Sequence, residues 1–589
     1  MTSATQEPRT TDIRKRIVLA RFFSRYSDTA GHVALIAIAI SAFASYYGYI
    51  AYGNPVKWLH LFFADDTFYY LKIAENAARY GFFTFDGIHY TNGFQPLWMV
   101  VLVALKQCIG NRDLLVATLY LCMLLHCVNS VLFGQLIRLL TGSVIWSLAS
   151  QLLFLSNTLL MKANFLLMEN TLAMTLIVML FIRVPTRRFL SVRPAPSQSI
   201  INGCLLAALA LTRIDYVLIV AALGMTTIFL RRRIISQEML MTYTPSIAAL
   251  LILALVNLAY FGNPGLISGQ VKHNVYVAGY LSDKHGWERM GVYLDSTINL
   301  IRTLQLLTFQ GIAEYISQHL DALGIGTACV TIATAAVHFL FRRTRSKNVP
   351  RSGSTLSILA LCACAILHAA AMVYYLPVFI FGSQWYFSLE TVAVIAAAIY
   401  VFSRASARLE LKGVGLLAAT LACQASIATA SQIGYEAKVW QPSPTSDRSL
   451  TYAMARYIDE TLPQDAIVGS FNAGIIGYYS NRRVVNLDGL VNDFEYYRRV
   501  LSRPAPPDAL QSYLKDSLVH YLVDYQACTT CSDDEILDNA VLQSRVSRAH
   551  LSLLKATRSD QQVPVRNVAN EIIAGRSASI LVYLLKVTP

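Results

Sequence analysis

The chain has 589 residues, of which 55% are hydrophobic and only 14% are charged. Charged residues make up roughly 25% of an ordinary soluble protein, so a chain this apolar could not cover its own surface in water. The composition excludes a disordered protein, a coiled coil and a small disulfide-rich module, and it favours a large membrane protein. The net charge of +14 would suit nucleic acid. The basic residues, however, stand in short clusters between apolar stretches, as in cytoplasmic loops of multi-pass proteins. We therefore expect the lipid bilayer, and no nucleic acid, as a partner.

Apolar runs of about 20 residues, long enough to cross a bilayer, recur along the first three quarters of the chain. The first, near 33–51, follows a long basic leader; we expect it to be retained as a helix, and a cleaved signal peptide is the less favoured alternative. The others lie near 114–138, 144–161, 166–182, 245–261, 322–341, 355–377, 385–402 and 412–430. The sequence predicts a polytopic α-helical membrane domain over 1–435 with about ten to twelve membrane segments.

Two stretches break the simple alternation of spans and loops. The apolar run 94–109 is short, and we expect a short, tilted or re-entrant helix there. The long run 200–230 has basic residues beyond both ends and is interrupted by Thr-Arg-Ile-Asp at 212–215. It predicts two half-helices that meet within the membrane, with Arg213 and Asp215 at a wet cavity. A packed Arg–Asp pair within one helix is the alternative.

The character of the chain changes near residue 436, where charged residues and prolines return. Short β-like runs such as 466–469 then alternate with helical ones, which predicts a soluble α/β domain over 436–589. The basic clusters between the spans are expected in the cytoplasm. By parity, this domain lies outside an inner (cytoplasmic) membrane. Cys528 and Cys531 could form a local disulfide there.

The first outer loop, 53–93, contains the most informative polar pattern. Asp65 and Asp66 begin a predicted helix that Gly81 ends, and an apolar stripe predicts that this helix lies along the outer membrane surface. The helix dipole favours ionised carboxylates at this position. Such a carboxylate could accept a proton from a hydroxyl nucleophile or hold a divalent cation. The simpler alternative is that the pair only caps the helix.

The stretch from Asp65 to Trp98 resembles the first extracytoplasmic loop of the GT-C class of integral-membrane glycosyltransferases. The likeness is greatest to bacterial members whose loop runs D-D-x-F-x-Y-L and then T-x-G-x-x-P-L-W, and mycobacterial cell-wall arabinofuranosyltransferases carry a related Asp-Asp loop. Leu167 and Ile214 depart from the family, which has Gly and Pro at these two positions. Shorter matches follow at 167–171, 211–215, 261–264 with Lys272, and 472–492.

The resemblance implies inverting transfer of a sugar from a polyprenyl-phosphate donor to a cell-envelope glycan or glycolipid acceptor at the outer face. Asp65 or Asp66 would be the catalytic base, and Arg213, Lys272 and His273 would bind the donor phosphate. No cofactor is required for such a donor, although a divalent cation, Mg²⁺ or Mn²⁺, could assist at the Asp pair. The candidate substrate-binding residues are Tyr69, His89, Asn92, Gln95, Trp98, Glu169, Asp215, Trp385, Tyr386 and Asp488.

Two other classes of protein share part of this pattern. Many spans and a broken helix that carries charges also fit a secondary transporter or a flippase for lipid-linked sugars. The large outer loop, the soluble C-terminal domain and the lack of a clear internal repeat favour the transferase. A non-catalytic assembly protein whose outer domain binds envelope glycans is a third alternative. His126, His338 and His368, inside apolar runs, are expected to be packing residues.

Overall fold

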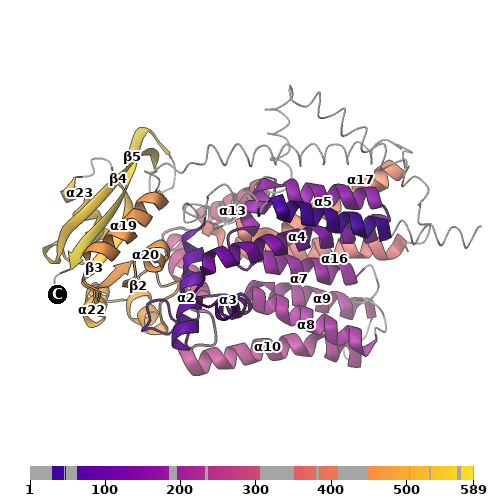
Figure 1. Cartoon of the computed structure of the whole chain (residues 1–589), viewed down its shortest axis with the longest axis horizontal. Helices are drawn as coiled ribbons and strands as arrows, with labels where there is room; N and C mark the ends of the chain where they lie inside the picture. The colour runs from indigo at the N-terminus through magenta and orange to yellow at the C-terminus, as the bar shows by residue number, and fades with distance from the viewer. Residues whose placement is uncertain are drawn as a thin grey trace, which may run out of the picture.

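The computed structural model describes residues 29–45, 47, 63–184, 195–231, 236–305, 351–379, 384–408, 447–502, 505–528, 532–544, 546–566 and 572–587. The predicted spans 322–341 and 412–430, His338, and the side chains of Cys528 and Cys531 lie outside the described residues. Figure 1 shows a bundle of apolar helices with a sheet-containing C-terminal domain at one end. The predicted fold class, a helical membrane-type domain followed by an α/β domain, is confirmed for the described part of the chain.

The bundle consists of apolar helices that pack side by side along their length (Figure 1). Four described helical segments are long and apolar enough to cross a membrane, and six more apolar helices are shorter. The long ones are α4 (Leu114–Thr141), α10 (Gln237–Phe261), the Ser354–Tyr375 part of α16 (Arg351–Tyr375), and Trp385–Arg404, which includes most of α17 (Ser388–Arg408). The shorter ones are Thr29–Ser45, α3 (Pro96–Ile109), α5 (Val144–Ser156), α7 (Asn170–Arg183), α8 (Pro196–Thr212) and α9 (Val217–Arg231).

The core of the bundle lies where α4, α7, α8, α9, α16 and α17 meet. These helices are apolar around most of their circumference, which is typical of helices buried on several sides. Phe133, Phe181 and Leu209 are among the side chains with 1% exposure or less. The short α6 (Thr158–Asn164) follows α5 directly. The bundle therefore supplies a rigid base for the polar residues at its ends.

Both irregular stretches deviate from a simple span. α3 has 14 residues and is about 21 Å long, which agrees with the predicted short segment. The run 200–230 is interrupted as predicted: α8 ends at Thr212, Arg213 is extended (φ −148°, ψ 121°), and the 3-10 turn η2 (Ile214–Tyr216) leads into α9. With 17 and 15 residues, α8 and α9 are about 25 and 22 Å long. Both are longer than half of the roughly 30 Å hydrocarbon core of a bilayer, so they exceed the half-helices that we expected.

The C-terminal domain contains a five-stranded sheet with the strand order β2-β1-β3-β5-β4. β1 pairs in parallel with β2 and β3, whereas β5 pairs antiparallel with β3 and β4. All four residues of β1 are buried, as expected for a strand covered on both faces. The strands are β1 (Ile467–Ser470), β2 (Arg483–Asn486), β3 (Tyr521–Cys528), β4 (Leu551–Arg566) and β5 (Ile572–Val587). The helices are α19 (Asp447–Thr461), α20 (Ala473–Tyr479), α21 (Phe494–Tyr496), α22 (Ala509–Asp516) and α23 (Asp533–Ser544).

The outer-loop helix α2 (Asp65–Tyr80) lies across the end of the bundle, next to the C-terminal domain (Figure 1). It ends at Gly81 (φ 80°) as predicted. Its apolar stripe does not lie open to lipid, however. Phe68 is fully buried, and its ring contacts Tyr478 and Tyr479 of the C-terminal domain. The prediction of a helix lying on the membrane surface is therefore corrected to a helix packed between two protein layers.

Two glycines allow the outer loop and the C-terminal domain to approach each other closely. A Cβ atom at Gly474, in α20, would lie 2.2 Å from the carbonyl oxygen of Asp65. A Cβ atom at Gly93 would lie 2.0 Å from the carbonyl oxygen of Leu490. No side chain fits at such distances, so both contacts require glycine. The outer loop and the C-terminal domain therefore pack as one unit at the end of the bundle.

Candidate active site

The two adjacent aspartates have different environments. Both oxygens of Asp65 accept backbone hydrogen bonds from the start of α20, from Gly474 N at 2.8 Å and Ile475 N at 2.9 Å. Burial raises the pKa of Asp65, although these two hydrogen bonds oppose the shift. The Asp66 side chain is 33% exposed, and its Oδ2 lies 3.8 Å from Lys272 Nζ. Neither aspartate caps α2 with its side chain, so the simpler capping alternative is wrong. Asp65 joins two domains, and Asp66 is the carboxylate that remains accessible.

Lys272 lies in the π-helix η3 (Val271–Val277), a distortion that is frequent at functional sites. Its Nζ donates a hydrogen bond to Tyr386 Oη at 3.0 Å. Burial alone would lower the pKa of Lys272, but Tyr386 and Asp66 beside it raise the pKa above its ordinary value. Lys272 therefore stays an ammonium ion next to the accessible carboxylate.

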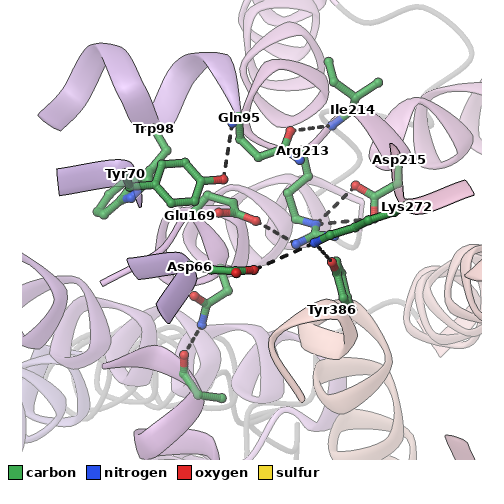
Figure 2. Close-up of polar contacts among 12 residues, drawn as sticks. Asp66, Tyr70, Gln95, Trp98, Glu169, Arg213, Ile214, Asp215, Lys272 and Tyr386 are labelled. Atoms are coloured by element: carbon green, nitrogen blue, oxygen red, sulfur yellow. Dashed lines mark hydrogen bonds and ion pairs between the residues drawn. The ribbon is translucent and has the colours of Figure 1, made fainter. Parts of the chain in front are cut away.

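Arg213 is almost fully buried and lies between two carboxylates. Its Nη1 donates to Glu169 Oε1 at 2.8 Å, and its Nη2 donates to Asp215 Oδ2 at 2.9 Å. The ring of Tyr386 covers the guanidinium at 4.7 Å. Figure 2 shows Asp66, Lys272 and this cluster pointing toward one another. The Arg–Asp pair of the alternative interpretation exists, but it stands at a helix break and includes a third charged residue.

The turn before Glu169 explains one departure from the family pattern. Leu167 has φ 59°, a left-handed conformation that glycine adopts without strain and other residues rarely adopt. Thr67 Oγ1 donates to the carbonyl of Leu166 at 2.7 Å, and Trp98 Nε1 donates to the carbonyl of Leu167 at 3.1 Å. The family's glycine thus fits the geometry, and this chain holds a leucine in the same conformation with bonds from α2 and α3.

The second departure also has a structural counterpart. Ile214 N donates to Gln95 Oε1 at 3.2 Å (Figure 2), a bond that a proline could not make. Gln95 N in turn donates to Tyr70 Oη at 3.3 Å. The predicted substrate residue Gln95 is therefore a link between the outer loop and the turn that carries Arg213.

The C-terminal domain reaches this region through Asp488, which follows β2. Tyr69 Oη donates to Asp488 Oδ2 at 2.9 Å, and Tyr276 Oη, from the same π-helix as Lys272, donates to the Asp488 carbonyl at 3.3 Å. Burial raises the pKa of Asp488 to about 7. Two predicted substrate residues, Tyr69 and Asp488, thus bond to each other across the domain contact.

Several other predicted substrate residues have structural contacts. Trp98 has no exposed surface, so burial argues against its predicted contact with a substrate. Asn92 is 2% exposed and joins the outer loop to the loop after α10, through bonds with Gly265 O and Ile267 N. His89 Nδ1 lies 2.5 Å from Asp86 Oδ2, so its ring is engaged within the loop that follows α2.

The remaining predicted residues lie beside Lys272. His273 Nδ1 donates to the carbonyl of Tyr375 at 3.1 Å. The Trp385 ring lies 5.7 Å from that of Tyr386, and Tyr386 is only 8% exposed. Because Tyr386 binds Lys272 through its hydroxyl and Arg213 through its ring, it supports the two cations rather than offering a free face to a sugar.

Sequence reasoning missed two charged residues of this site. His368 in α16 was expected to be a packing residue, but its Nε2 lies 2.9 Å from Asp215 Oδ2. Its Nδ1 lies 2.7 Å from Glu390 Oε1, in α17. The signal was present, because ionisable residues inside apolar spans are rare and are by default functional candidates.

A Mg²⁺ or Mn²⁺ ion at the Asp pair, which the sequence allows but does not require, would have few free donor atoms there. Both Asp65 oxygens already accept backbone hydrogen bonds, which leaves Asp66 as a single carboxylate ligand. In the part of the chain that the structure describes, no group of three or more His, Cys, Asp or Glu side chains could hold a metal ion. The cluster instead offers one accessible carboxylate beside two cations.

One family model and several solved structures match parts of the chain. A family described as a domain of unknown function (DUF8728) matches residues 438–567, and no curated protein matches. The apo oligosaccharyltransferase of Archaeoglobus fulgidus is 13% identical over 84% of this chain and 69% of that chain, with a TM-score of 0.44. The Archaeoglobus fulgidus oligosaccharyltransferase AglB with an inhibitory peptide and a dolichol-phosphate is 12% identical, with coverages of 84% and 69% and a TM-score of 0.42. ArnT from Cupriavidus metallidurans bound to undecaprenyl phosphate is 12% identical, with coverages of 94% and 97% and a TM-score of 0.38.

Proposed function

We propose that the protein is a membrane glycosyltransferase that moves a sugar from a polyprenyl-phosphate donor to a cell-envelope glycan or glycolipid, with inversion at the anomeric carbon. The observation that carries the proposal is the placement of Asp66, a partly exposed carboxylate, 3.8 Å from Lys272 Nζ in a cluster with Arg213. The negative charge of Asp66 suits removal of the proton from an acceptor hydroxyl. The two cations suit a phosphate leaving group.

The proposed reaction is a single displacement. Asp66 accepts the proton of the acceptor hydroxyl. At the same time, the oxygen of that hydroxyl forms a bond to the anomeric carbon. The bond from that carbon to the phosphate oxygen breaks, and its electron pair leaves with polyprenyl phosphate. Lys272 and Arg213 stabilise the charge that develops on the leaving oxygen. Each Arg213 nitrogen donates to a carboxylate, but a guanidinium has five N–H donors, so two remain for a phosphate.

The location follows from the donor. A lipid-linked sugar can reach the protein laterally through a bilayer, and the cluster lies at the end of the helix bundle where α2 and the C-terminal domain meet (Figure 1). In the proposed topology this end faces the outside of the inner membrane. A cysteine introduced in α19 would test that side with an impermeant maleimide on intact cells. Glu460→Cys is a better probe than Leu450→Cys, because Glu460 is exposed and Leu450 is buried. If the cysteine did not react with the maleimide in intact cells, the topology would be overturned.

The decisive experiment uses purified protein with a radiolabelled polyprenyl-phosphate sugar and envelope acceptors. We expect release of polyprenyl phosphate and labelling of the acceptor. Lys272→Met should lower kcat/KM by roughly 10²- to 10³-fold, as loss of one transition-state donor typically does. Lys284→Met is the matched control, because Lys284 contacts Tyr280 instead of the cluster. Movement of the labelled lipid across proteoliposomes without bond cleavage would instead establish a flippase.

A further inference from the structure

His368 connects the Arg213 cluster to the interior of the bundle. Its side chain is fully buried, and each ring nitrogen faces a different carboxylate. Nε2 lies 2.9 Å from Asp215 Oδ2, which belongs to the turn between α8 and α9. Nδ1 lies 2.7 Å from Glu390 Oε1, which belongs to α17. The ring of Tyr216 is 5.0 Å away and covers a third side.

This geometry suits a doubly protonated ring. With both carboxylates ionised, each can only accept a hydrogen bond, so the histidine between them donates from both nitrogens as an imidazolium. Buried charges are tolerated when they are paired and hydrogen-bonded. Negative and positive side chains alternate along a row of five contacting residues: Glu390, His368, Asp215, Arg213 and Glu169.

The chain of contacts converges on the guanidinium. Asp215 Oδ2 accepts from both His368 and Arg213, and Arg213 Nε also donates to the Asp215 carboxylate, at 3.2 Å. The orientation of the guanidinium thus depends on Asp215, and the orientation of Asp215 depends on His368. Glu390 Oε2 is buried without a hydrogen-bond partner among the described residues, so His368 is the contact that holds Glu390 in turn.

We propose that His368 is a positioning residue, which as an imidazolium holds Asp215 against Arg213 and thereby presents the guanidinium to the donor phosphate. The proposal rests on the proposed function. The charge balance of these five residues supports the proposal. They comprise three carboxylates and two cations, so loss of the imidazolium would leave a second uncompensated negative charge beside the phosphate site. That charge would repel an anionic donor.

The test measures binding of polyprenyl phosphate to the purified full-length protein and then kcat and KM for transfer. His368→Gln should weaken binding and raise KM for the donor by roughly 10- to 100-fold, the range expected for loss of a hydrogen bond between charged groups. His126→Gln is the matched control, because His126 is also buried in the bundle but its ring contacts Asn164, Phe154 and Phe165. We expect this variant to bind as the wild type does.

A pH series separates positioning from packing. Glu390→Gln removes the carboxylate that needs the Nδ1 proton, so the ring no longer has to carry both protons. The groups that face the ring are Asp215, Glu390 and Tyr216, with Arg213 and Glu169 beyond Asp215. Binding by this variant should fall from about pH 6 toward pH 8, because deprotonation of the ring over the ordinary titration range of histidine replaces the charge-assisted bond from Nε2 to Asp215 with a weaker neutral one. Wild-type binding should change little over the same range.

The outcomes are distinct. If the wild type binds no polyprenyl phosphate, both the proposed function and the positioning role of His368 are overturned. If the wild type binds and His368→Gln binds equally well, only the positioning role is overturned. A defect in Glu390→Gln that is the same at every pH would show a packing role and would also overturn it. Because Glu390→Gln keeps the ring in place, the test holds even where His368→Gln folds poorly.

Discussion

The contrast between Asp65 and Asp66 can be tested with two identical chemical changes at neighbouring positions. Asp66→Asn removes the accessible carboxylate and leaves the hydrogen bonds of Asp65 to α20 in place. Because a general base typically contributes 10²- to 10⁴-fold, we expect kcat to fall by roughly that factor. Folding should be little affected, because the contact of the Asp66 side chain within the described part of the chain is a 3.8 Å ion pair with Lys272.

Asp65→Asn should have the opposite profile. An amide oxygen can accept the bond from Gly474 N or from Ile475 N, but the amide nitrogen then faces a second N–H donor. Leaving one buried donor unsatisfied costs about 1–3 kcal/mol. The expected result is weaker docking of the C-terminal domain, with kcat reduced much less than in Asp66→Asn at a temperature where both proteins are folded.

The assay combines release of labelled polyprenyl phosphate with thermal unfolding and limited proteolysis of both variants. The assignment of the base to Asp66 would be refuted if Asp66→Asn kept a tenth or more of the wild-type kcat. It would also be refuted if Asp65→Asn lost as much activity as Asp66→Asn while its melting temperature stayed at the wild-type value.

Four further predictions follow from the same contacts. Gly474→Ala should loosen the C-terminal domain, because its Cβ would overlap the Asp65 carbonyl; proteolysis would show faster cleavage between the domains. The folded pKa of Asp488, about 7, is higher than that of an unfolded Asp. The folded state thus holds this proton more tightly, and stability falls as the pH rises from about 4 through 7; Asp488→Asn should flatten the melting temperature over that range. Leu167→Gly relieves roughly 1–2 kcal/mol of left-handed strain but loses a fully buried side chain worth about 2–5 kcal/mol, so denaturant unfolding should show a net loss of stability. Treatment with EDTA should leave the transfer rate unchanged, since two side-chain cations can serve the phosphate, and a rate restored only by Mg²⁺ or Mn²⁺ would contradict this.

The sequence alone was sufficient for features that depend on local pattern. Apolar runs predicted the helices of the bundle, and the polar interruption at 212–215 predicted the break between α8 and α9. Gly81 marked the end of α2, and the run 466–469 predicted β1 within one residue at its start and end. Helix periodicity, chain breakers and hydrophobic length act over a few residues, so the order of amino acids specifies them directly.

The tertiary structure distinguishes candidate residues that the sequence leaves equivalent. Asp65 and Asp66 are neighbours in sequence, and contacts with distant residues distinguish them: Asp65 with Gly474 and Ile475, and Asp66 with Lys272. Likewise, His368 differs from a packing histidine because Asp215 approaches it from the turn between α8 and α9 and Glu390 from α17. Hydrogen bonds and ion pairs act over about 3–4 Å between residues that are far apart in the chain. Their partners are fixed by the packing of the helices and of the C-terminal domain, which no local pattern contains.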